Sequence, residues 1–180
     1  MAPAVAAIEA LLGLAIRHVN AGQRGRARLL CEQAVATHPP HPAVQQLLAV
    51  ISLHEGDADA ALEFAQASLA LRADHPPTMR VAADAWFQVS LARHAAGDAA
   101  GELLALREVL RIAPERAEAE LNLGLALQEG GEIDAAMQAY GRAFRLREDT
   151  FGRIAHALAT PNVGRLWLDL GALKSALRAA

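Results

Sequence analysis

Histidine is the residue type in this sequence with the most potential for chemistry, because its seven copies could bind a metal or transfer protons. His38 and His41 lie in the segment THPPHP, and His75 lies in DHPP. His41 and His75 are 34 residues apart, a spacing that recurs along the chain and gives them equivalent positions in two repeats. Zinc sites need a tightly convergent set of ligands, whereas loops of successive repeats lie on the order of 10 Å apart. We therefore expect no metal site.

Cys31 is the single cysteine, so no intrachain disulfide can form, which is consistent with a reducing compartment such as the cytoplasm. No histidine lies at a spacing that would activate its thiol, and the glycines are spaced as helix ends rather than as a phosphate-binding loop. The sequence therefore predicts a noncatalytic protein without a cofactor, in which the Cys31 side chain packs in the hydrophobic core between helices.

Charge and hydropathy argue against two further classes of protein. The net charge of −3 gives no general reason to expect a nucleic-acid partner. The apolar segments are short and carry charges such as Glu9 and Arg17, so none offers the roughly 20 apolar residues that cross a bilayer. The N-terminus has no basic segment before its apolar run, so we expect no secretory signal. These features predict a cytoplasmic protein that is not inserted in a membrane.

The elements that position these residues are expected to be helices throughout. Strong helix formers such as Ala, Leu, Arg, Glu and Gln dominate, and aromatic residues make up only 4% of the chain. Apolar residues recur at spacings of three and four, as in Leu47, Leu48 and Ile51. A glycine follows each of four such runs, where a left-handed C-cap would end a helix. These glycines are Gly22, Gly56, Gly97 and Gly131. The predicted fold class is all-α.

The same glycines measure a sequence repeat. Gly22 and Gly56 are 34 residues apart, and so are Gly97 and Gly131, whereas Gly56 and Gly97 are 41 apart. The predicted repeats are 8–41, 42–75, 83–116 and 117–150, with a seven-residue insert at 76–82. Seven residues make about two helical turns and barely rotate the buried face. We expect the insert to lengthen the first helix of the third repeat; a longer connector is the alternative.

A helix-turn-helix repeat of 34 residues resembles the tetratricopeptide repeat family. The fourth repeat carries the most matches to the family pattern: Leu123, Gly124, Leu127, Ala136, Tyr140 and Ala143. Gly124 and Ala136 are expected to be small because the two helices of the repeat cross there. The resemblance covers 8–150. It implies a right-handed superhelical solenoid of about four repeats, whose first helices line a concave groove.

In that family the concave groove usually captures a peptide or helix of another protein. The resemblance assigns the partner-binding groove to Leu12, Ile16, Val19, Asn20, Gln46, Val50, Leu53, His54, Phe87, Leu91, His94, Leu121, Leu125 and Gln128. Most of these residues are apolar, and a contiguous exposed apolar patch generally marks a binding site. The polar members Asn20, His54, His94 and Gln128 would set the register of the partner through hydrogen bonds.

The sequence therefore predicts a noncatalytic interaction scaffold or adaptor that binds an apolar peptide or helix. One alternative is a self-assembling module that forms homo-oligomers through its groove or tail. A further alternative is an accessory subunit that holds substrates for a modifying enzyme.

Glu102 departs from the repeat pattern, because the other repeats have alanine at this helix crossing. A carboxylate buried without a partner is costly. We expect Glu102 to bond Ser90 or to reach Arg93; a functional acid is the alternative.

The C-terminal segment 151–180 does not follow the repeat. Residues 151–160 can form one more helix, Pro161 breaks it, and an apolar segment follows with Asp169 as a plausible helix N-cap. Leu170, Leu173 and Leu177 would share one face of that last helix, preceded by Leu166, Trp167 and Leu168. Three interpretations stay open: a cap on the last repeat, insertion into the groove of this chain or a sister chain, and a motif for an outside partner.

Overall fold

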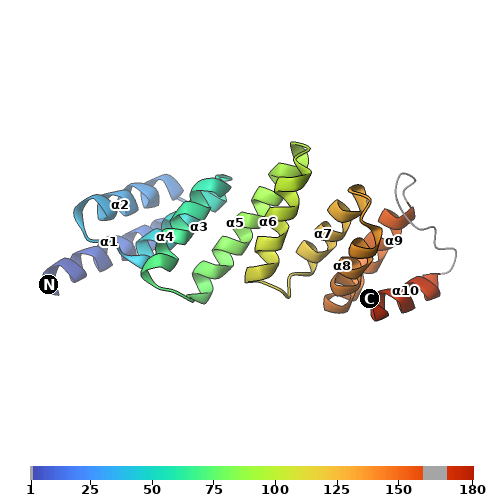
Figure 1. Ribbon diagram of the computed structural model, residues 1–180. Helices are drawn as coiled ribbons and strands as arrows, with labels where there is room; N and C mark the ends of the chain where they lie inside the picture. The colour runs from blue at the N-terminus through green and yellow to red at the C-terminus, as the bar shows by residue number, and fades with distance from the viewer. Residues whose placement is uncertain (1, 160–169) are drawn as a thin grey trace. The chain divides into compact units, whose positions relative to one another are not determined.

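The computed structural model describes residues 2–159 and 170–180, and within these ranges the chain forms helices and no strand (Figure 1). The helices of the predicted repeats are α1 (Ala2–Asn20), α2 (Arg24–Thr37), α3 (Pro42–Glu55), α4 (Ala58–Leu71), α5 (Pro76–Ala95), α6 (Ala99–Ile112), α7 (Ala117–Glu129) and α8 (Ile133–Leu146). They are followed by the 3-10 helix η1 (Glu148–Thr150), α9 (Phe151–Ala159) and α10 (Leu170–Ala179). The all-α prediction is confirmed.

The four glycines that measure the repeat end helices as expected. Their φ angles are 73° at Gly22, 83° at Gly56, 72° at Gly97 and 82° at Gly131. After α3, the Gly56 N–H donates to the Leu53 carbonyl and the Asp57 N–H donates to the Ser52 carbonyl, at 3.2 and 3.0 Å. Such bonds satisfy the last carbonyls of a helix and require a left-handed residue, which glycine adopts without strain.

Residues 76–82, which were expected to be an insert, are helical and form the start of α5. α5 begins at Pro76 and has 20 residues, against 14 in α3. Proline suits a helix start because its missing N–H would have no partner there. The first turn is fixed by Thr78, whose buried Oγ1 lies 2.9 Å from His75 Nδ1 and 3.3 Å from Ser68 Oγ of α4. The His75 side chain thus stabilises the first turn of α5 through its contact with Thr78.

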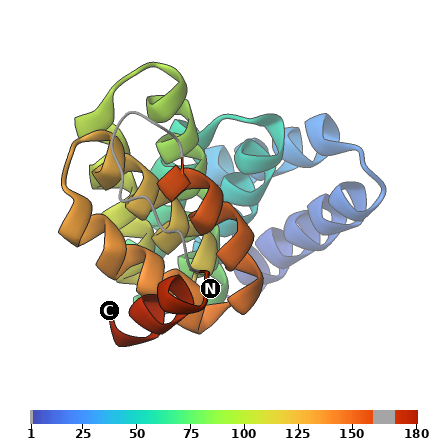
Figure 2. The same cartoon turned by 90° about the vertical axis from the view of Figure 1, so that its right-hand side faces the viewer.

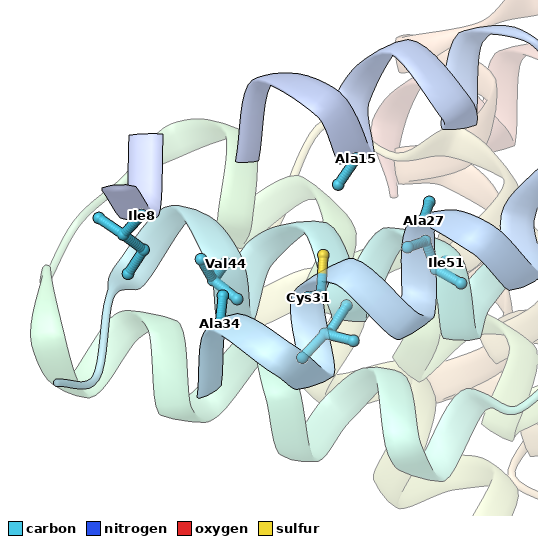
Figure 3. Close-up of a cluster of buried hydrophobic side chains, with 8 residues drawn as sticks. Ile8, Ala15, Ala27, Cys31, Ala34, Val44 and Ile51 are labelled. Carbon is cyan, nitrogen blue, oxygen red and sulfur yellow. The ribbon is translucent and has the colours of Figure 1, made fainter. Parts of the chain in front are cut away.

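The chain divides into two compact units, Met1–Gln88 and Val89–Ala180, each with its own core. In the N-terminal unit, Figure 3 shows the side chains that meet between α1, α2 and α3. Ala15 and Ala27 are fully buried there, which agrees with a close approach of α1 and α2. Polar contacts join α2 to α3: Arg28 of α2 donates a hydrogen bond to Ser52 Oγ of α3 at 3.0 Å and forms an ion pair with Glu55 of α3.

The C-terminal unit packs around Tyr140, which is fully buried. A Cβ added at Gly124 of α7 would lie 2.4 Å from the Tyr140 ring carbons Cδ1 and Cε1. A crossing of the two helices was the expected reason for a small residue at this position. The structure gives a more specific reason, since the ring of an α8 side chain occupies the space above Gly124.

The end of the chain packs on the last repeat. α10 lies against α8 and α9, as both views in Figures 1 and 2 show, and its Leu173 and Leu177 are buried. This position agrees with the cap interpretation. The expected N-cap Asp169 and the apolar residues Leu166, Trp167 and Leu168 lie outside the described residues.

Candidate partner-binding surface

The N-terminal unit has an open apolar hollow between its first helices. Its lining residues are Leu12 and Ile16 of α1 with Ala43, Gln46, Leu47 and Val50 of α3. We call this feature the α1–α3 hollow; its volume is about 170 Å³. Ile16 is 43% exposed, and Leu12 and Val50 are half-buried. The hollow therefore presents aliphatic side chains to solvent, with the Gln46 amide as the polar group of its lining.

The hollow contains four of the residues predicted for the groove: Leu12, Ile16, Gln46 and Val50. Leu47 was missed in that prediction, although it lies three residues before Val50 and so can share its helix face. The predicted neighbours Val19 and Leu53 are half-buried, and Asn20 and His54 are exposed. His54 Nδ1 lies 2.7 Å from the Val50 carbonyl oxygen of its own helix, so this nitrogen is already bonded.

α5 carries three predicted groove residues, and they differ in environment. Phe87 is half-buried, Leu91 is 42% exposed, and the exposed His94 lies near the end of the helix. His94 Nδ1 is 3.1 Å from Glu102 Oε2 of α6. The hydrogen bond and the charge of Glu102 raise the pKa of His94, and the charge of Glu129 adds to this while burial opposes it.

Glu102 has a partner that the sequence analysis did not name. The residue is only 7% exposed, and its carboxylate faces His94. Arg93 pairs instead with Asp98 at 3.3 Å, at the start of α6. Because His94 lies one turn beyond Ser90 on α5, it can reach over the helix end to this carboxylate. Glu102 is thus part of an ion pair when His94 is protonated.

Two predicted groove residues of α7 are buried and cannot contact a partner in this structure. Leu121 has no exposed surface. Gln128 donates from Nε2 to the Ala157 carbonyl of α9 at 2.9 Å, and its Oε1 accepts a bond from the Tyr140 hydroxyl at 2.7 Å. Gln128 therefore joins three helices. Leu125 is half-buried. The burial of these α7 residues could have been inferred from the apolar pattern of 151–159, which predicts a helix after the last repeat.

The described part of the chain offers little for metal or nucleophilic chemistry. Within it, no set of three or more histidine, cysteine, aspartate or glutamate side chains is placed to hold a metal ion. Burial raises the pKa of the Cys31 thiol to about 11, and the charge of Glu32 adds to the effect. A thiol is a nucleophile mainly as its thiolate. In the same described residues, none of the helices is long and apolar enough to cross a membrane.

The sequence and the fold are similar to those of known proteins. Residues 117–150 match the family model for the tetratricopeptide repeat, with the boundaries expected for the fourth repeat. No curated protein matches the sequence. Among solved structures, a crystal structure of MamA is 22% identical, with a TM-score of 0.56 over 79% of this chain and 80% of that chain.

Two further structures have the same fold. MamA 41-end from Desulfovibrio magneticus RS-1 is 17% identical, with a TM-score of 0.60 over 83% of this chain and 81% of that chain. The MamA RS-1 ArsTM double mutant is 15% identical, with a TM-score of 0.64 over 94% of this chain and 89% of that chain. Residues 117–150 thus form a tetratricopeptide repeat, helix pairs of the same period precede it, and the chain has the fold of a tetratricopeptide-repeat solenoid.

Proposed function

We propose that the protein is a noncatalytic adaptor whose α1–α3 hollow binds an apolar side chain of a partner helix or extended segment. The observation that carries this proposal is the hollow itself, where aliphatic side chains of two neighbouring helices remain open to solvent. Its volume of about 170 Å³ is below the roughly 300–1,000 Å³ of small-molecule sites. It suits an anchoring side chain of a polypeptide better than a cofactor.

The energetics support a modest, specific contact. Complete burial of an aliphatic side chain contributes roughly 1.5–3 kcal/mol, so the half-exposed Leu12, Ile16 and Val50 retain part of that free energy for a partner. The Gln46 amide can donate to and accept from the backbone of the bound segment, which would fix its register.

The test uses the full chain as bait in a lysate of its host, followed by titration with the retained protein after purification. The variants Ile16→Glu and Val50→Glu place a charge in the hollow. The matched control is Leu29→Glu on α2, where the leucine is 66% exposed and outside the hollow. We expect both hollow variants to weaken binding at least tenfold with unchanged circular dichroism, and the control to bind as the wild type does.

Two outcomes would contradict the proposal. A partner that binds the hollow variants as tightly as the wild type would place the interaction on another surface. Loss of helical content in Val50→Glu and Ile16→Glu would mean that these side chains are needed for folding rather than for binding. We also propose that the adaptor acts in the cytoplasm, since its single cysteine is an unpaired thiol.

A further inference from the structure

α10 occupies a specific seat on the last repeat. We define the α10 seat as the face of α8 and α9 that contains Gly141, Phe144, Arg145 and Phe151. Leu173 and Leu177 of α10 are almost fully buried against this face. A Cβ at Gly141 would lie 2.8 Å from the Leu177 carbonyl oxygen and 3.0 Å from Ala180 Cβ. The close approach of α10 therefore depends on a glycine in α8.

Polar and aromatic groups add specificity to this contact. Arg145 Nη1 donates to the Leu177 carbonyl at 3.2 Å, near the end of α10 where carbonyls lack helical partners. Lys174 Nζ lies 4.7 Å from the centre of the Phe151 ring, which is a cation–π distance. Arg178 lies similarly over Phe144, at 5.9 Å. The seat thus recognises a short helix with two leucines four residues apart and a basic residue after each.

The sequence separation between α9 and α10 is longer than that between other consecutive helices. α9 ends at Ala159 and α10 begins at Leu170, so ten residues separate them, against two to four between consecutive helices of the repeats. A short turn forces a helix to pack on its predecessor, whereas ten residues can span up to about 33–36 Å. α10 has 10 residues and is too short to be a stable helix without its seat.

We propose that the α10 seat also accepts α10 of a second copy, so that two chains exchange this helix and form a swapped dimer. The contacts in the exchanged form are the same as those within one chain, so protein concentration and the connecting residues decide which form is populated. A tether of ten residues gives α10 an effective concentration on the order of millimolar at the seat of its own chain. This inference does not depend on the proposed function, because the hollow lies in the other compact unit.

The experiment mixes two full-length variants with complementary defects. Gly141→Leu blocks the seat but retains a normal α10, and Leu173→Asp/Leu177→Asp retains the seat but has a defective α10. Each variant alone should have the molar mass of one 19.0 kDa chain. The equimolar mixture, at up to about millimolar concentration, should form a 1:1 heterodimer, detected by light scattering after size exclusion and by distinct tags on the two variants.

Controls separate this outcome from other associations. Gly152→Leu changes a glycine of α9 whose Cβ would meet no atom within 4 Å, so its own seat stays filled and its mixture with the tail variant should give much less heterodimer. Adding Val50→Glu to both chains should leave the heterodimer unchanged, whatever that change does to the binding of a foreign partner. If Gly141→Leu or the tail variant loses helical content, Gly141→Ala and Leu173→Ala/Leu177→Ala replace them. A mixture of folded variants that stays monomeric throughout this range would overturn the proposal.

Discussion

The α1–α3 hollow and the equivalent part of α7 occupy the same repeat positions but differ in exposure. Leu12 and Leu121 are equivalent, yet Leu12 borders an open hollow and Leu121 has no exposed surface. Val19 and Gln128 are also equivalent. The Val19 side chain is half-buried and has no polar group, whereas the Gln128 amide forms hydrogen bonds with groups of α8 and α9. An equivalent position in a repeat therefore does not imply an equivalent role.

The difference follows from what packs against each first helix. α3 brings the small side chain of Ala43 to the surface of α1, and the space beside it stays open. In α9, the backbone carbonyl of Ala157 accepts a hydrogen bond from the Gln128 amide. Burying an amide is favourable only when its groups are bonded, and here both the donor and the acceptor are. The same kind of position thus serves as surface in one unit and as core in the other.

The largest loss in the free energy of unfolding is expected at Gly124, which packs against Tyr140 in the C-terminal unit. Gly124→Ala would place a methyl group 2.4 Å from the ring of Tyr140, which is buried and hydrogen-bonded and so cannot move freely. Overpacking of this kind costs typically 1–3 kcal/mol, and we expect about 3 kcal/mol in urea denaturation. Gly25→Ala on α2 is the matched control, because its added methyl meets no atom within 4 Å and should be neutral or slightly stabilising. Equal stability of the two variants would contradict the tight contact.

A second, smaller effect compares the equivalent residues Gln128 and Val19. Gln128→Ala leaves the Tyr140 hydroxyl and the Ala157 carbonyl without their partner, which should lower the free energy of unfolding by about 1–3 kcal/mol. Val19→Ala removes two methyl groups from a half-buried side chain and should cost about 1 kcal/mol or less. An equal loss in the free energy of unfolding for both variants would contradict the difference in role between the buried Gln128 and the half-buried Val19.

The smallest effect concerns the pH dependence at His94. Because Glu102 raises the pKa of His94, the folded protein binds this proton more tightly than the unfolded chain does. The resulting stability is fully present below the unfolded pKa of about 6.5 and is lost as the pH rises through the higher folded pKa. The His94 side chain is 55% exposed, so solvent reduces the gain. His94→Gln should remove this loss in thermal melts between about pH 5 and pH 8.5. Glu102→Gln should remove it as well.

The fold was largely predictable because it depends on spacing. Glycine at a fixed period favours a helix end at each position, and Pro76 with a seven-residue insert favours a longer α5 with the same buried face. These features are local, so one sequence suffices to infer them. Four residues of the α1–α3 hollow were among those predicted for the groove, since a repeat position fixes the helix face on which a side chain lies.

Burial at the end of the array was not predictable from the repeat. Gln128 and Leu121 become core because of packing with elements beyond their own helix, and α9 lies outside the repeat pattern. The Glu102 partner also depends on tertiary geometry. His94 is eight residues away across a turn, and only the crossing of α5 and α6 decides whether it or Arg93 lies nearer.

The burial of Cys31 has a consequence for measuring motion. The chain has one cysteine, in the core of the N-terminal unit, and its thiol is both enclosed and protonated at neutral pH. A thiol reagent can therefore react only during transient opening of the helices around it. The rate of labelling would report the opening frequency of the N-terminal unit alone, because the C-terminal unit contains no cysteine.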